Sequence, residues 1–289
     1  MAAGAQAGTR LLGGLAVRTT TDRATLRAFL ERDRLYAAYA LCDLDPREFP
    51  RTRWGIATQD EAPVAVAMEY AGLSPQPLFV MGEPAAVSAI LRDVLRPRAA
   101  FLAALPAHLE AVADLYRIQA GPPMVRMWVD RAHFRPHPGA AARLLPAEIP
   151  DLNRLYDLGF SSWLPGDSIA NGVYYGIRVG GRLVAAAGTH VISPEARLAA
   201  VGNVMTHRDY RGRGYAKTTT SAVTQELLRS CDQVILNVRS DNPPALAAYR
   251  ALGYQEHCRF EERLVHRRGP GWDSIVLPFR RWLSSRKES

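Results

Sequence analysis

Cysteine is scarce in this sequence. Cys42, Cys231 and Cys258 are the three cysteines among 289 residues, and they lie far apart with no C-x-x-C pair. A disulfide framework and a structural zinc site both depend on closely spaced cysteines, so the sequence argues against both. His133 and His137 are four residues apart, but the prolines around them forbid the regular helix that a two-histidine metal site would need. We therefore expect no bound metal.

Long apolar runs are also absent. No uninterrupted apolar stretch is long enough to cross a bilayer. Residues 1–17 are rich in Ala and Gly and are too weakly apolar for a secretory signal. These absences predict a cytoplasmic protein without a membrane partner.

Negative charge is in the minority, with 28 Asp and Glu against 36 Lys and Arg and a net charge of +8. A basic chain can bind nucleic acid. The arginines here are scattered, however, and do not form one stripe with interleaved aromatic residues. We expect them to serve a polyphosphorylated cofactor, with no nucleic-acid partner.

The order of predicted elements suggests two α/β domains. In the first half we expect strands at 15–20, 54–58, 64–70, 78–82, 100–105 and 124–129, with helices from Asp22 towards Leu35, at 85–95 and at 108–116. Residues 131–142 contain two prolines and a glycine and suit a linker. In the second half we expect strands at 142–145, 173–178, 183–192, 198–206 and 234–238, with helices at 146–158, from Tyr215 and from Asn242.

A glycine-containing turn leads from the 198–206 strand into a helix. Its sequence is Arg211-Gly212-Arg213-Gly214-Tyr215-Ala216. Glycines allow a tight turn and close approach of a ligand to the backbone. The N–H groups at the start of the helix and the positive end of its dipole favour an anion. This stretch therefore predicts a phosphate-binding loop.

A second motif follows the 234–238 strand and reads Asn242-Pro243-Pro244-Ala245-Leu246-Ala247-Ala248-Tyr249-Arg250-Ala251-Leu252-Gly253-Tyr254. Asn242 and the two prolines are typical of a helix start, and Gly253 is typical of a helix end. Ala245 and Tyr249 are four residues apart and share one helix face.

The two motifs together resemble the Q/R-x-x-G-x-G/A and N-x-x-A-x-x-x-Y-x-x-x-G-F/Y signatures of the GNAT superfamily of acyl-CoA N-acyltransferases, and the resemblance spans residues 140–265. It implies an α/β (α+β) fold of tandem GNAT-like domains, each with a central mixed, mostly antiparallel sheet flanked by helices. Residues 1–135 would form a divergent, degenerate domain and residues 140–289 a GNAT N-acetyltransferase domain that binds acetyl-CoA. The resemblance implies cofactor-binding residues Val204, Met205, Thr206, Arg211, Gly212, Arg213, Gly214, Tyr215, Ala216, Asn237, Asn242, Ala245 and Tyr249.

The first half lacks the phosphate loop. Gly82-Glu83-Pro84 stands after the 78–82 strand, with an acid and no second glycine. A carboxylate at that point would repel a pyrophosphate. We interpret the first half as a degenerate GNAT-like domain; an unrelated α/β domain with a similar order of elements is the alternative.

Acyl transfer to an amine needs a proton acceptor, a donor to the leaving thiolate and polarisation of the thioester carbonyl. The resemblance places Tyr249 where the family has the acid, and a strand bulge at Val204–Met205 would free a backbone N–H for the carbonyl. The glutamate base of many relatives is replaced here by apolar residues, so His190 is our catalytic base candidate, with Glu195, water or the free amine as alternatives. We expect Phe160, Trp163 and Asn203 at the acceptor site.

The predicted function is therefore transfer of an acetyl group from acetyl-CoA to a primary amine of a small molecule, amino acid or peptide, by a monomer or homodimer. The motifs look closest to the glycine N-acyltransferase-like branch, which would allow longer or aromatic acyl groups. An acyl-CoA-binding sensor without turnover is the third hypothesis.

Overall fold

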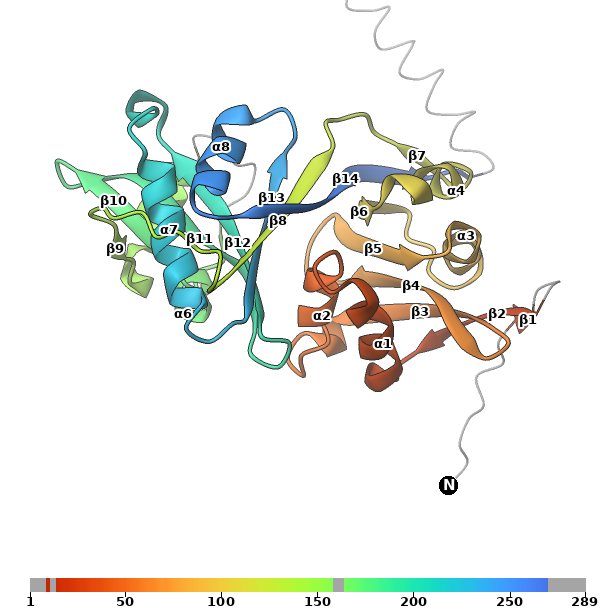
Figure 1. Ribbon diagram of the computed structural model, residues 1–289. Coiled ribbons are helices and arrows are strands. Elements are labelled where there is room, and N and C mark those ends of the chain that lie inside the picture. The colour runs from red at the N-terminus through yellow and green to blue at the C-terminus, as the bar shows by residue number, and fades with distance from the viewer. Residues whose placement is uncertain (1–8, 11–13, 158–163, 270–289) are drawn as a thin grey trace, which may run out of the picture. The chain divides into compact units, whose positions relative to one another are not determined.

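The computed structural model describes residues 9–10, 14–157 and 164–269 (Figure 1). By contacts between residues the chain forms two compact units. Unit 1 contains residues 1–22, 50–121 and 261–289, and unit 2 contains residues 23–49 and 122–260. The predicted boundary between 135 and 140 divides the chain by sequence order, whereas these units exchange segments.

Unit 1 is a mostly antiparallel sheet with helices. Its strand order is β1-β2-β3-β4-β5-β6-β14, and β7 also pairs with β14. Among the described strands of this sheet, only β5 and β6 are parallel to each other. The elements are β1 (Thr9–Arg10), β2 (Leu15–Thr20), β3 (Thr52–Gln59), β4 (Ala62–Tyr70), β5 (Gln76–Gly82), α3 (Pro84–Asp93), β6 (Ala99–Ala104), α4 (Leu109–Ala113), β7 (Tyr116–Ile118) and the second part of β14 (Gln255–Arg267).

Unit 2 has a second sheet with the strand order β14-β8-β13-β12-β11-β10-β9. Again one neighbouring pair, β12 and β13, is parallel, and the others are antiparallel. Its strands are β8 (Met124–Asp130), β9 (Ala142–Arg143), β10 (Tyr175–Val179), β11 (Arg182–Ser193), β12 (Leu198–Thr206), β13 (Gln233–Arg239) and the first part of β14.

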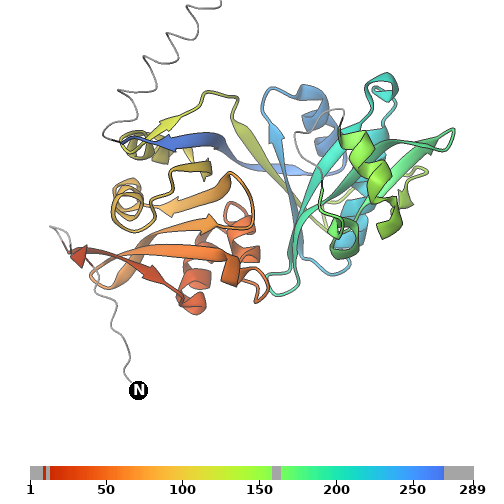
Figure 2. The same ribbon diagram turned by 180° about the vertical axis from the view of Figure 1, so that it is seen from behind.

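Helices cover both faces of the unit 2 sheet. α7 (Tyr215–Leu227) and α8 (Pro243–Ala251) pack on one face, where alternate residues such as Val201, Leu236 and Val238 form a buried core with them. α5 (Ile149–Tyr156) and α6 (Ser168–Asn171) pack on the opposite face, where Leu152 and Ile169 join a second core (Figure 2).

Two helices from early in the chain also belong to unit 2. α1 (Arg23–Leu30) and α2 (Ala38–Cys42) precede β3, yet α2 contacts β11 and β12. Short 3-10 turns complete the described chain, at Glu31–Asp33, Phe49–Arg51, Pro106–His108, Pro146–Glu148 and Arg208–Tyr210.

The element order agrees with the predicted mixed α/β architecture, but several local predictions need correction. The short helices α2 and α6 were not predicted. The predicted helix at 108–116 ends at Ala113, because Tyr116 starts a short strand that pairs with β14. The strand predicted at 142–145 is shortened to Ala142–Arg143. β14 was not predicted, because its charged residues obscure the strand pattern, although it pairs first with β8 and then with β6 and β7.

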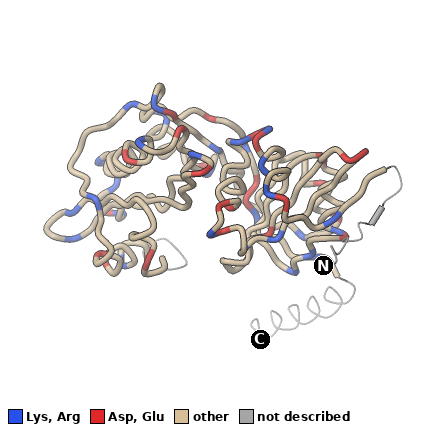
Figure 3. The backbone as a smooth tube through the Cα atoms, turned by 90° about the horizontal axis from the view of Figure 1, so that it is seen from below, with Lys and Arg blue, Asp and Glu red and all other residues tan. Residues whose placement is uncertain are grey.

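Charged residues of both signs are distributed along the chain. Figure 3 shows Lys and Arg interspersed with Asp and Glu along the described backbone. None of the helices in the described ranges is both long enough and apolar enough to span a membrane.

Candidate active site

The parallel strands β12 and β13 separate before they end. Their pairing runs from Leu198 opposite Gln233 to Val201 opposite Leu236 and then stops, although β12 continues to Thr206 and β13 to Arg239. Parallel strands in an α/β sheet commonly bind ligands at their carboxyl ends, where neighbouring strands diverge. The last residues of β12 therefore offer unpaired backbone groups to a ligand.

A bulge lies in the same part of β12. Gly202 pairs with Gly188 and Met205 with Ala186, so Asn203 and Val204 together oppose one residue of β11. Asn203 has a φ of 52°, a left-handed conformation that asparagine tolerates better than most residues. The predicted bulge exists, one residue earlier than expected.

The predicted phosphate loop is an open turn at the start of α7. Gly212 and Gly214 have φ values of 76° and 78°, and a Cβ atom added at either would meet no atom within 4 Å. Gly214 is the N-cap, and no side chain caps α7. The first N–H groups of a helix lack partners within the helix, so those of α7 are available to an anion.

Two other helix starts lack the open glycine turn of α7. α8 is capped, because the Asn242 side chain accepts a hydrogen bond from the Ala245 N–H at 3.3 Å. In unit 1, a Cβ atom at Gly82, before α3, would lie 2.2 Å from the Val64 carbonyl oxygen. The place that corresponds to a phosphate loop is thus filled by backbone in the first half and open in the second.

Arginines flank the open turn. Arg211 and Arg213 are exposed. The Arg211 Nε donates to the Thr206 carbonyl at 3.3 Å, and the Arg213 guanidinium carbon lies 5.2 Å from the centre of the Tyr210 ring. These contacts hold the Arg211 and Arg213 side chains near the loop. The loop therefore combines backbone N–H donors with two positive charges, which suits the binding of a pyrophosphate.

Tyr249 lies on the α7 side of the sheet. It is buried in the core that includes Val201, Val223 and Leu246. Its hydroxyl has no hydrogen-bond partner among the described residues, whereas the neighbouring Tyr254 hydroxyl is 2.7 Å from the Thr224 hydroxyl. Burial raises the pKa of Tyr249 to about 12. This phenol is therefore protonated at neutral pH and has a proton to donate.

His190 lies on the other face of the sheet, over the bulge. A Cβ atom added at Gly202 would come within 2.1 Å of the His190 Nε2, so the glycine makes room for the ring. Nε2 is 3.2 Å from the Asn203 Oδ1, and Nδ1 is 2.9 Å from the Tyr39 hydroxyl of α2. Desolvation lowers the pKa of His190, and the imidazole is therefore neutral at neutral pH.

The hydrogen bonds beyond Asn203 fix the tautomer of His190. The Tyr174 hydroxyl donates to the Thr189 carbonyl at 3.0 Å, since a carbonyl can only accept. Tyr174 then accepts from the Asn203 Nδ2 at 3.2 Å, which turns the Asn203 Oδ1 towards His190. The His190 Nε2 must carry the hydrogen, and Nδ1 is left as an acceptor for the Tyr39 hydroxyl.

The structure places the remaining predicted residues on both sides of the separated strands. Val204 contacts the α7 core and Met205 the α5 core. Asn237 follows the last residue of β13 that pairs with β12, and its Oδ1 accepts from the Arg126 Nε at 2.7 Å. Tyr215 and Ala216 form the first turn of α7. Phe160 and Trp163 lie outside the described residues.

Tyr39 and Arg126 were not predicted as site residues. Tyr39 reaches His190 across 151 positions of sequence, and Arg126 reaches the backbone of Leu35 and Tyr36 from β8. No local pattern in the sequence marks such distant contacts. The aromatic content of the segment from 35 to 44 is a signal for Tyr39 but not for Arg126.

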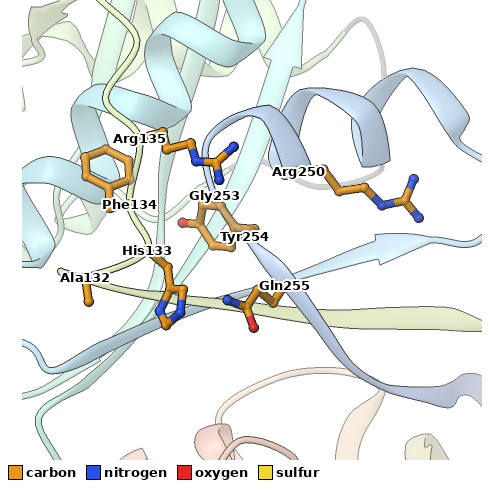
Figure 4. Close-up of a pocket in the computed structure, with 8 residues that line it drawn as sticks. All are labelled: Ala132, His133, Phe134, Arg135, Arg250, Gly253, Tyr254 and Gln255. Carbon is orange, nitrogen blue, oxygen red and sulfur yellow. The ribbon is translucent and has the colours of Figure 1, made fainter.

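A pocket of about 270 Å³ lies elsewhere in unit 2 (Figure 4). Residues 132–135 line one side of it, and Arg250, Gly253 and Gln255 line the other. Residues 132–135 follow β8, whose Asp130 pairs with Gln233 at the start of β13. The pocket is therefore at the opposite end of the strands from the separation of β12 and β13.

Comparison with known proteins agrees with this geometry. Residues 141–254 match the acetyltransferase (GNAT) family. This segment is similar to GNAT acetyltransferase domains. Within the described residues, no group of three or more His, Cys, Asp or Glu side chains could hold a metal ion.

One curated relative resembles a short part of the chain, and solved structures resemble most of it. A mycothiol acetyltransferase of Corynebacterium aurimucosum is 44% identical over 54 residues, which are 17% of this chain and 18% of that protein. A GCN5-related N-acetyltransferase of Sphaerobacter thermophilus has a TM-score of 0.60 at 14% identity, covering 89% of this chain and 96% of its own. A tandem GNAT protein from the clavulanic acid biosynthesis pathway has a TM-score of 0.53 at 16% identity, covering 89% and 99%. The structural likenesses support a tandem GNAT fold across both halves.

Proposed function

We propose that the GNAT domain transfers the acetyl group of acetyl-CoA to a primary amine by direct attack. The observation that carries the proposal is the uncapped, glycine-opened start of α7 beside the separated ends of β12 and β13. A ligand with a pyrophosphate and an amide-containing arm has groups that suit both features.

The residues present fit such a ligand. The N–H groups at the start of α7, with Arg211 and Arg213, would bind the pyrophosphate. The unpaired edge of β12 from Gly202 to Thr206 would pair with the amides of the arm. A freed N–H at the Asn203–Val204 bulge would polarise the thioester carbonyl.

The two faces of the sheet divide the acid–base work. The acceptor nitrogen loses a proton and forms a bond to the acetyl carbon, while the carbon–sulfur bond breaks and sulfur leaves as a thiolate. Tyr249, protonated and without a hydrogen-bond partner in the described chain, would give its proton to the thiolate. Neutral His190 on the opposite face is the candidate acceptor of the amine proton.

The experiment is release of free CoA from acetyl-CoA by the full chain, with panels of small amines, amino acids and peptides. Amine-dependent release supports transfer, and the acetylated product is identified by mass spectrometry. Faster turnover with longer or aromatic acyl-CoAs would favour the glycine N-acyltransferase-like alternative. Binding of acetyl-CoA with no release for any acceptor would favour an acyl-CoA sensor.

A further inference from the structure

We propose that Tyr39 is a catalytic residue that accepts the proton of the acceptor amine and passes its own hydroxyl proton to His190. The inference rests on the proposed acetyl transfer and adds the route of the proton. It also gives the early segment α1–α2 a function in the active site of the second half.

The geometry fixes the direction of the route. The Thr189 carbonyl can only accept, and this sets the direction of the hydrogen bonds through Tyr174 and Asn203 to His190. The unprotonated nitrogen of neutral His190 is therefore Nδ1. Both ring nitrogens are already hydrogen-bonded, so an amine has no direct access to the basic nitrogen. It reaches Nδ1 through the Tyr39 hydroxyl, 2.9 Å away.

The transfer balances without another reactant. One N–H proton of the acceptor moves to the Tyr39 oxygen as the Tyr39 hydroxyl proton moves to the His190 Nδ1. The phenol is regenerated, and His190 becomes an imidazolium whose Nε2–H remains on Asn203. Part of the His190 side chain is exposed, so the imidazolium can return its proton to solvent.

A buried arginine fixes the position of the relay. Arg126 is 3% exposed and donates through Nη1 to the Leu35 and Tyr36 carbonyls, both at 2.8 Å. Its guanidinium carbon lies 5.4 Å from the centre of the Tyr39 ring, within the range of a cation–π contact. These contacts tie the segment before α2 to β8 and hold Tyr39 over the sheet.

Charged groups on neighbouring elements lie near the relay. Arg126 faces Tyr39 from β8, and the turn after β11 carries Glu195, paired with Arg23 and Arg27 of α1. Asp45, after α2, accepts from the Ser193 hydroxyl at 2.8 Å. The pKa of His190 is lowered by burial and raised by its Asn203 hydrogen bond. Asp43, the C-cap of α2, is also buried, and its pKa is raised to about 7, so the pH profile of Asp43→Asn separates its titration from that of His190.

The test compares wild-type protein with Tyr39→Phe, using an amine acceptor found in the panel. We expect turnover to fall by about 100-fold, in the range of general acid–base catalysis, with the affinity for acetyl-CoA unchanged. In wild type, turnover should decline as the pH falls through the lowered pKa of His190. In Tyr39→Phe this fall in turnover at low pH should disappear. Removing a hydroxyl with only a structural role would leave the pH dependence unchanged. Tyr70→Phe, which removes a tyrosine hydroxyl of unit 1 that accepts from Arg51, is the matched control.

An independent reading comes from the ¹⁵N NMR shifts of His190, assigned with His190→Gln. We expect the neutral ring to carry its hydrogen on Nε2. A hydrogen on Nδ1, or full turnover with an unchanged pH profile in Tyr39→Phe, would overturn the relay while acetyl transfer stands. No acetylation of any amine by the wild-type protein would overturn the proposed function and the relay with it.

Discussion

The most informative perturbation is a pair of substitutions at Gly214. Gly214 is the N-cap of α7, has a φ of 78° and faces open space. Gly214→Ala and Gly214→Glu both force a side chain into a left-handed conformation, at a cost of about 1–2 kcal/mol each. A typical stability of roughly 5–15 kcal/mol absorbs this cost, so both variants should fold.

The two variants differ in what they place in the loop. Alanine adds a methyl group in open space, whereas glutamate adds a negative charge where the pyrophosphate is proposed to lie. A hydrogen bond to a charged group contributes roughly 1.5–3 kcal/mol, so two lost bonds amount to about 3–6 kcal/mol. At about 1.4 kcal/mol per factor of ten, Gly214→Glu should weaken acetyl-CoA binding by at least about 100-fold relative to Gly214→Ala.

Calorimetric titration with acetyl-CoA measures this difference, and thermal unfolding checks that the variants are equally stable. The comparison between variants removes the shared backbone strain. Equal affinities for acetyl-CoA in Gly214→Ala and Gly214→Glu would refute the assignment of the phosphate site to this loop.

Further predictions concern Tyr249, Asp43 and Asn242. Tyr249→Phe should lower turnover by about 100-fold with acetyl-CoA affinity retained, and unchanged turnover would remove the phenol from the mechanism. Since the pKa of Tyr249 is about 12, a pH–rate profile should show no loss from its ionisation below about pH 11. Burial raises the pKa of Asp43 from 3.8 to about 7, so the folded state binds its proton more tightly than the unfolded state and loses stability as the pH rises through this range. Asp43→Asn should therefore have a larger free energy of unfolding than wild type at pH 8, by up to roughly 4 kcal/mol. Denaturant unfolding should show this difference shrinking towards pH 4, and a difference that does not change with pH would contradict the prediction. Asn242→Ala should cost about 1 kcal/mol of unfolding free energy through loss of the α8 cap, and urea titration measures it.

Local chemistry made most of the second half predictable. Asn242, Pro243 and Gly253 mark the ends of α8 because capping, a missing N–H and a positive φ are properties of single residues. The glycines of the α7 turn were predictable for the same reason. The missing loop after β5 could also be predicted, since Glu83 replaces a residue that an anion site would need.

The exchange of segments was not predictable in this way. α1–α2 and β8 join unit 2, and the second part of β14 joins unit 1, through pairings between residues far apart in sequence. Periodicity indicates that a segment is a strand or helix, but not which distant partner covers it. The Tyr39–His190 contact depends on that exchange, which is why His190 could be proposed from sequence and its partner could not.

The most direct test of the account is the product of a reaction between acetyl-CoA and the amine panel. We predict that CoA is released only when an amine is present, and that mass spectrometry finds one acetyl group on that amine in equal amount. Release of CoA without an acetylated amine, or no release with any acceptor, would contradict the assignment of an acetyltransferase site to the separated ends of β12 and β13.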